Sequence, residues 1–464
     1  WRQENDYDEI GNNSNQRFNL RSNTTFQITD WLSLESMISY NRQEQVAPTD
    51  VGKMLTVNIP MPGLPLFSQN GKPYGWGTWA SPAAIAEYGG DNRLSVSAIH
   101  INETFKAKIT KWLDANVNLG YSSSTAERNK VWKAVDYYNY AGTKKVLTTP
   151  TSADSYYEQT SSSTDFYSVS AYLNGHHSFN KVHNLNVTLG GQYEFKDYTY
   201  FGVKAKDIQD ALDIVNGTGE ITLVSPNKYQ WAIGSAFARA NYDYKEKYLV
   251  ELNARYDGSS KFQPENRWAF FWGGSLAWRI AEEGFLDDAE WLDELKLRAS
   301  YGEVGNQSGI DNYDGVLLYN QSAASGALVG SNLLSQITTN GKLVSLTRQW
   351  ERVQNYNVGL DFGFLGNRLT GSVEAFLKQN NNMLVGISYP SLIGDSAPQT
   401  NSGKFKAWGY EGILQWRDNI GDFSYSLGGT FTFARNKLVD LGGDAAITAG
   451  SYVSNREGYP LNSL

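Results

Sequence analysis

The sequence predicts an all-β protein whose strands form a transmembrane antiparallel β-barrel. Three observations lead to this prediction. Apolar residues recur at every second position, tight turns alternate with long loops, and aromatic residues end the apolar faces. Aromatic residues make up 14% of the 464 residues, with 29 Tyr and 14 Trp. Such rings suit positions where one end is dry and the other wet.

The alternation is clearest in YLVELNARYDGSS, residues 248–260. Strict alternation indicates a strand with one apolar and one polar face. Similar segments cover residues 113–121, 185–195, 356–364 and 423–433. We expect about 14 strands, most of them longer than usual. In residues 248–260 the apolar face would carry Tyr248, Val250, Leu252, Ala254 and Tyr256, and the polar face Leu249, Glu251, Asn253, Arg255 and Asp257.

The connections between these segments are sorted by length. Outer-membrane barrels have short turns at one end and long loops at the other, whereas both ends of a soluble sandwich meet the same water. Residues 259–264 and 281–292 depart from the scheme, and the second is expected to hold one helical turn. Short turns are expected near Asp30, at 110–111, 180–182 and 245–246, and near Gly366 and Gly421; long loops are expected at 46–92, 126–163, 204–226, 305–348, 382–403 and from 437.

The length of an apolar face fits a lipid bilayer. Tyr248 to Tyr256 spans roughly 26 Å at about 3.3 Å per residue. With a tilt of about 40° this gives roughly 20 Å along the membrane normal, near the apolar band of about 25 Å between aromatic girdles. The apolar face is therefore predicted to contact lipid and the polar face to line the interior. A soluble β-sandwich or propeller would also require the alternation.

Composition excludes several classes of protein. The net charge of −8 and the pI near 5.2 argue against a nucleic-acid partner. The absence of Cys excludes disulfides and thiolate chemistry. His100, His176, His177 and His183 form no metal-binding spacing, and no nucleophile elbow or Walker loop is present. We therefore expect no enzyme, no cofactor, and neither catalytic nor metal-binding residues.

Residues 248–286, YLVELNARYDGSSKFQPENRWAFFWGGSLAWRIAEEGFL, resemble the SusC-type (SusC/RagA) TonB-dependent transporters of Bacteroidetes outer membranes. The family pattern is an alternating strand ending in R-x-D-G-S-S-x-F, followed by N-R-W-x-x-F and W-R-I. The matching residues are Arg255, Asp257, Gly258, Ser259, Ser260, Phe262, Asn266, Arg267, Trp268, Phe271, Trp278, Arg279 and Ile280.

Four more family-like segments follow in order, so the resemblance covers most of the chain from about residue 17. They are residues 295–307, 350–384 (which begins with Trp350 and Glu351), 401–412 and 457–461. One departure is Ala407, where the family usually has Asn.

The resemblance implies that residues 1–464 are a partial TonB-dependent receptor β-barrel domain, the plug domain and the C-terminal strands lying outside them. Such barrels have about 22 strands. It also implies active import of a glycan or an oligopeptide across the outer membrane. The implied partners are TonB, contacted through the N-terminal region, a SusD-like surface lipoprotein, and outer-membrane lipid, with pairs assembling as dimers. Two alternatives remain open: a passive outer-membrane porin and a soluble β-rich glycan-binding protein.

Two loop features could bind ligands. Tyr74, Trp76 and Trp79 lie in a glycine-rich long loop, where exposed rings could stack on sugars or contact a partner lid. The more ordinary alternative is that they pack the loop onto its neighbours. Structural Ca²⁺ in the extracellular loops is a second possibility, although solvated acidic residues are the more ordinary explanation because the spacing of a full calcium-binding loop is missing. The residues concerned are Asp207, Asp210 and Asp213, and the segment Asp311–Gly315.

Overall fold

The computed structural model describes residues 2–5, 13–49, 64–208, 215–316, 319–323, 328–329, 332–333, 336–340, 343–386, 392, 398–442 and 455–461. The chain forms two compact units. One comprises residues 1–106, 118–169 and 194–230, and the other residues 107–117, 170–193 and 231–464. Among the described residues, no helix is both long and apolar enough to cross a membrane.

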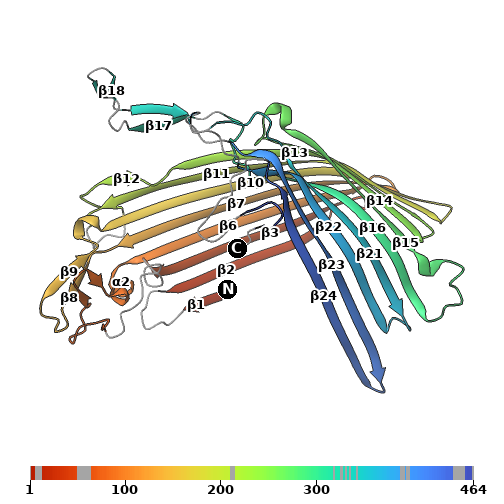
Figure 1. Ribbon diagram of the computed structural model, residues 1–464, viewed down its shortest axis with the longest axis horizontal. Coiled ribbons are helices and arrows are strands. Elements are labelled where there is room, and N and C mark those ends of the chain that lie inside the picture. Colours follow the sequence, from red (N-terminus) through yellow and green to blue (C-terminus); the bar gives the residue numbers. More distant parts are fainter. Residues whose placement is uncertain are drawn as a thin grey trace. The chain divides into compact units, whose positions relative to one another are not determined.

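Among the described residues, sixteen strands form one sheet in which, apart from β12, hydrogen-bonded neighbours follow sequence order (Figure 1). All the strand pairs of this sheet with an assigned register are antiparallel. The strands are β1 (Arg2–Asn5), β2 (Ser14–Gln27), β3 (Leu32–Pro48), β6 (Asp91–Lys108), β7 (Leu113–Trp132), β10 (Tyr156–Phe179), β11 (His183–Lys206), β12 (Ile221–Leu223), β13 (Asn227–Tyr244), β14 (Tyr248–Ser259), β15 (Trp268–Arg279), β16 (Leu292–Asn306), β21 (Glu351–Phe364), β22 (Leu369–Val385), β23 (Thr400–Ile420) and β24 (Phe423–Asp440).

The strand count agrees with the sequence prediction, because fourteen of these strands have 12 or more residues and only β1 and β12 are short. The loop predicted at 126–163 is shorter than expected, since β7 continues to Trp132 and β10 begins at Tyr156. The residues added to the two strands, AERNKVW and YYEQTSSS, are mostly polar or charged, so they lack the apolar alternation that would have revealed them. The helical turn expected within 281–292 is a 3₁₀ helix, η3 (Ile280–Glu282).

All six short turns lie where the sequence predicts them, and several use left-handed backbone. Asn180 and Lys181 have φ of 52° and 59°, and Lys245 and Glu246 have φ of 52° and 56°. Two successive positive φ values are typical of the two-residue hairpin turn whose twist matches the strands. The hydrogen bond that closes the second turn runs from Lys247 N to Tyr244 O, at 3.0 Å.

The register in the second unit places apolar residues of neighbouring strands side by side. Tyr248 on β14 pairs with Trp278 on β15, which pairs with Leu297 on β16. These side chains are exposed, as are Leu252, Tyr256 and Leu276 on the same face. We call this side the apolar face. The opposite side carries Glu251, Asn253 and Arg255 in the same register, and we call it the polar face.

The ladder between β15 and β16 is incomplete. It runs from Arg279↔Lys296 to Gly273↔Gly302 and stops there, although β15 begins at Trp268 and β16 continues to Asn306. Both strands keep their other neighbours, β14 and β21, along these residues. The backbone groups that face each other across this opening therefore need other partners.

Two long loops of the first unit have a core of their own. They contain β4 (Gly75–Trp76), β5 (Trp79–Ala80), α2 (Pro82–Tyr88), β8 (Val135–Tyr138), β9 (Lys145–Thr149) and η1 (Ser152–Asp154). Buried Ala84, Ile85, Val135 and Tyr137 pack together, with Leu147 at the edge. Figure 1 shows α2, β8 and β9 gathered at the same end of the strands. These loops thus form a folded cap and not merely extended connections.

The loop between β16 and β21 also carries local structure, comprising β17 (Tyr319–Ala323), β18 (Leu328–Val329), β19 (Asn332–Leu333) and β20 (Gln336–Asn340). The connection from β14 to β15 contains a short 3₁₀ helix, η2 (Pro264–Asn266).

Candidate functional site

A cavity of about 820 Å³ lies along the polar face of β13–β16. Its charged groups come in pairs. Arg239 donates to the Glu251 carboxylate at 2.6 Å, and Asn253 donates to the other Glu251 oxygen at 2.7 Å. These two hydrogen bonds engage both carboxylate oxygens of Glu251. The cavity therefore presents fixed donors and acceptors to a polar solute.

Arg255, the first residue of the family-like motif, joins three strands beside the cavity, β11, β13 and β14. Its Nε donates to both Asp257 oxygens, at 2.8 and 3.0 Å. One of its terminal nitrogens donates to Ser235 at 2.9 Å and to Gln192 at 3.2 Å. Asp257 is buried, so this charge-assisted bonding compensates for its lost hydration. The motif residues Arg255 and Asp257 therefore have a structural role beside the cavity.

A second charged network lies on the polar face of β16, β21 and β22. Arg298 on β16 donates to Glu374 on β22 at 2.7 Å and contacts Asp361 on β21 at 3.3 Å. To reach β22 the guanidinium crosses β21 at Gly359. A Cβ on Gly359 would lie 2.6 Å from Arg298 Cζ. Gly359 is thus required because a side chain from the neighbouring strand occupies its space.

We expect Gly359→Ala to displace the Arg298 guanidinium and weaken its bond to Glu374. The pair is partly exposed, so the predicted loss of stability is about 1 kcal/mol. The urea midpoint of the folded protein in detergent measures it. Gly302→Ala is the matched control, because a Cβ there meets nothing within 4 Å. Equal midpoints for the two variants would contradict this account of Gly359.

Trp350 and Glu351 connect two motifs that are far apart in sequence. Trp350 is buried against Phe262 and Phe271, with ring centroids 5.1 and 5.8 Å away. Its indole nitrogen donates to the Arg267 carbonyl at 2.9 Å. The first motif therefore needs the second to complete its core, which explains why both occur in one chain.

Glu351 is a buried carboxylate with three donors. It accepts hydrogen bonds from Leu384 N at 2.6 Å, Asn306 Nδ2 at 2.7 Å and Asn380 Nδ2 at 3.3 Å. The donors lie on β16 and β22, the two neighbours of β21. One carboxylate thus ties three strands at their loop ends.

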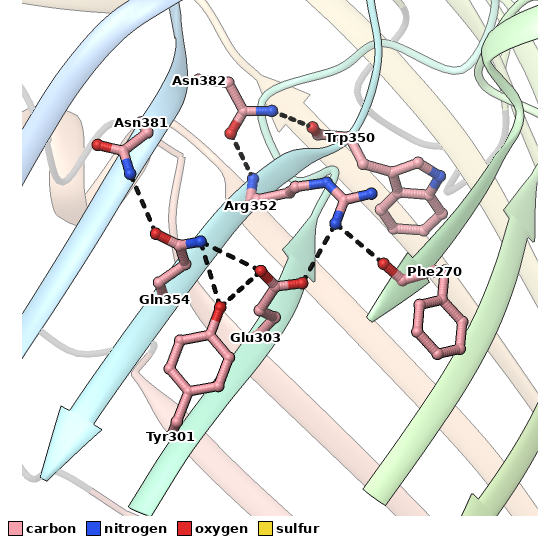
Figure 2. Close-up of polar contacts among 8 residues, drawn as sticks. All are labelled: Phe270, Tyr301, Glu303, Trp350, Arg352, Gln354, Asn381 and Asn382. Carbon is pink, nitrogen blue, oxygen red and sulfur yellow. Dashed lines mark hydrogen bonds and ion pairs between the residues drawn. The ribbon is translucent and has the colours of Figure 1, made fainter. Parts of the chain in front are cut away.

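Side chains occupy the opening between β15 and β16 (Figure 2). Arg352 on β21 donates to the Phe270 carbonyl on β15 at 2.9 Å, where the ladder from β16 is missing. The same terminal nitrogen lies 3.2 Å from Glu303 on β16. A Cβ on Gly305 would lie 2.4 Å from the Phe271 ring, so this ring fills the neighbouring space. The opening is closed by side chains in place of backbone hydrogen bonds.

The Glu303 carboxylate is held by a polar network on the apolar-face positions of β16 and β21. Tyr301 donates to it at 2.7 Å and Gln354 at 3.1 Å. Asn381 then donates to Gln354 at 3.0 Å. The Glu303 side chain is 8% exposed, which makes these partners necessary. Figure 2 shows all of these groups converging beside Arg352.

The other motif residues have structural partners. Trp268 stacks on Tyr256 at 5.1 Å and covers Gly258, where a Cβ would lie 2.5 Å from the indole. Asn266 donates to the Leu346 carbonyl at 2.8 Å. At the turn end, Trp278 donates to Glu283 at 2.9 Å, and Arg279 pairs with Glu282 at 2.9 Å.

The three predicted loop aromatics separate into different environments. Tyr74 is buried and contacts the Trp79 ring at 6.0 Å and the Tyr140 ring at 6.4 Å. Trp79 is partly buried. Trp76 pairs with Trp79 across the β4–β5 hairpin, but its side chain is 61% exposed. Trp76 alone is therefore free to meet a ligand or a partner.

Two of the acidic residues considered for Ca²⁺ have protein partners in the structure. Asp207 accepts a hydrogen bond from Thr218, and Asp314 forms a buried ion pair with Arg348. Burial is the main cause that lowers the pKa of Arg348. Asp210 and Asp213 lie outside the described residues. Within the described residues, no group of three or more His, Asp or Glu side chains could hold a metal ion.

Sequence reasoning missed Arg298, Glu303 and Arg352 as parts of networks. A signal for Arg352 was present, because Arg352 and Gln354 are polar residues at the alternate positions of β21 that continue with Tyr356 and Val358 on the apolar face. A polar interruption of an apolar face indicates either the membrane boundary or a partner on the next strand.

Residues 63–463 match the family described as "TonB dependent receptor-like, beta-barrel". The TonB-dependent receptor SusC of Bacteroides thetaiotaomicron is 32% identical over 247 residues, which cover 50% of this chain and 24% of SusC. The RagAB peptide transporter structure has a TM-score of 0.80 at 18% identity, covering 97% of this chain and 50% of that chain. The siderophore receptor PiuA from Acinetobacter baumannii gives a TM-score of 0.54 at 13% identity, covering 99% and 60%.

The aligned region spans about a quarter of the length of SusC, and the structural likenesses, all below 25% identity, show the fold alone. The family match decides between the two fold classes considered above, in favour of the membrane barrel and against a soluble sandwich. The chain is similar to the SusC and RagA proteins, belongs to the TonB-dependent receptor β-barrel family, and is an outer-membrane protein.

Proposed function

We propose that the protein imports a large nutrient across the outer membrane with energy transmitted by TonB. The observation that carries this proposal is the family match over residues 63–463. The polar face supports this proposal, since a polar solute would pass beside its fixed guanidinium, carboxylate and amide groups. A plug domain from the same protein would sit against this wall and be displaced during transport.

The substrate class we propose is a glycan or an oligopeptide. The similarity to SusC-type receptors favours a nutrient of this size, and one structural relative is described as a peptide importer. Both classes present many hydroxyl or amide groups, which suit the paired donors and acceptors around Arg239, Glu251 and Arg255.

Uptake by a strain lacking the gene tests the function. With labelled oligosaccharides and oligopeptides supplied separately, complementation should restore uptake of one class, and TonB deletion should abolish it. Uptake that persists without TonB, together with steady ion conductance of the purified protein in planar bilayers, would instead indicate a passive porin.

We further propose a SusD-like surface lipoprotein as partner, in pairs that dimerise. The folded cap of the first unit offers a contact surface with three exposed rings, Trp76, Tyr88 and Tyr140, of which Trp76 is the most exposed. Copurification of the full-length protein from its native membrane, followed by mass spectrometry, tests for the lipoprotein.

Trp76 and Tyr74 give opposite predictions although they are neighbours. Trp76→Ala should leave cap stability unchanged while weakening partner or substrate binding by about tenfold, because an exposed ring acts as an interface anchor. Tyr74→Ala should destabilise the cap by about 3 kcal/mol, since Tyr74 is buried. Limited proteolysis measures cap stability, and copurification yield and uptake measure binding. Unchanged binding with Trp76→Ala would remove this ring from the interface.

A further inference from the structure

A group of three cations lies on the apolar face of β23 and β24, at the loop ends of these strands. Lys406 pairs directly with Lys437, and Trp408 pairs with Arg435. The next pair on this face is Tyr410 and Phe433, both exposed. We call Lys406, Arg435 and Lys437 the cation group.

The cation group consists of three positively charged side chains and includes no carboxylate. Lys406 and Lys437 are directly opposite each other, an arrangement that destabilises an antiparallel pair. Within the part of the chain that the structure describes, none of the three forms an ion pair. Lys404, two residues from Lys406, does pair with Asp440 at 3.0 Å, so an acidic partner is available to this region but goes to another lysine.

Aromatic rings hold two of these cations at the edge of the apolar surface. Lys406 Nζ lies 5.4 Å from the Trp408 ring centroid, and the Arg435 guanidinium lies 5.4 Å from the Phe433 centroid. Contacts of this kind leave the N–H donors free for an anion. The donors are thus available at the level where an aromatic girdle ends and lipid headgroups begin.

We propose that the cation group binds the phosphate groups of a phosphorylated lipid headgroup in the outer leaflet. A phosphate between Lys406 and Lys437 would neutralise their repulsion and accept several hydrogen bonds at once. The position of the cation group favours a membrane lipid as the ligand, because the group lies at the end of the exposed apolar face that acyl chains cover. Inorganic phosphate shares the headgroup chemistry but would gain nothing from Tyr410 and Phe433.

Native mass spectrometry of the full-length protein in detergent tests the proposal. Phosphorylated lipid A and its dephosphorylated form are the probes, with inorganic phosphate as a separate arm. We expect retention of the phosphorylated lipid at least about tenfold above the dephosphorylated form. The double variant Lys406→Gln with Lys437→Gln should lose this preference, and the double replacement by Arg should keep it.

Lys378→Gln is the matched control. Lys378 lies on β22, and its register partner Ala407 is the residue next to Lys406, so it has the same height but the opposite face. We expect this variant to retain the lipid like the unmodified protein. Equal binding of both lipids, or unchanged preference in the Gln double variant, would overturn the proposal. Displacement of the lipid by millimolar inorganic phosphate would assign the group to free phosphate instead.

Discussion

Replacing Glu351 by alanine is expected to destabilise the loop ends of β16, β21 and β22 severely. The carboxylate is buried and accepts hydrogen bonds from Leu384 N, Asn306 and Asn380. Its removal would leave three donors without their acceptor at a buried position. Each orphaned donor costs about 1 kcal/mol or more, so the total loss is predicted at about 3 kcal/mol or above.

The urea midpoint and the shift in gel mobility on heating measure this loss for the full-length protein. Glu351→Gln should cost less, because one amide oxygen can still accept a hydrogen bond, although its NH₂ group would face another donor. Glu290→Ala is the control, since Glu290 is exposed in the turn region. A midpoint for Glu351→Ala within the range of Glu290→Ala would show that the three bonds contribute little.

The sequence was sufficient to place the long strands and the six short turns, although not the ends of β7 and β10. Alternation is a local property, so residues 248–260 already separate Tyr248, Leu252 and Tyr256 from Glu251 and Arg255. The six short turns likewise follow from the gaps between alternating segments. The membrane interpretation followed from the sorting of loops, which no local signal could give.

Contacts that depend on the register between strands could not be predicted from the sequence. Arg298 crosses β21 at Gly359, and nothing in either segment predicts that these two residues meet. The opening between β15 and β16 is similar, because both strands keep their alternation where their ladder ends. The folded cap was missed since its core joins residues near 84 and 137 from separate loops.

The different environments of the loop aromatic residues could not be predicted from the sequence either. Tyr74 and Trp76 are two residues apart and look equivalent in a glycine-rich loop. The β4–β5 hairpin and the packing against Tyr140 bury the first and expose the second. Only the fold of the cap therefore distinguishes a packing residue from a candidate contact.

Trp350→Ala is expected to be the most destabilising aromatic truncation in the core that Phe262, Phe271 and Trp350 form. Trp350 is 6% exposed, and its loss would leave a cavity between Phe262 and Phe271. Truncation of a buried aromatic costs about 3–5 kcal/mol. The Arg267 carbonyl would also lose its donor, which would loosen the connection between β14 and β15.

Two further variants separate these contributions. Trp350→Phe keeps most of the packing but removes the indole N–H, so its cost should be about 1 kcal/mol. Trp291→Ala, with a 57% exposed indole, should cost much less in detergent. Because Phe271 also occupies the opening between β15 and β16, Trp350→Ala should increase hydrogen exchange at Trp268–Trp272 while exchange at Trp278 stays unchanged. Equal exchange at both ends of β15 would mean that Trp350 stabilises the strand as a whole and has no particular role at the opening.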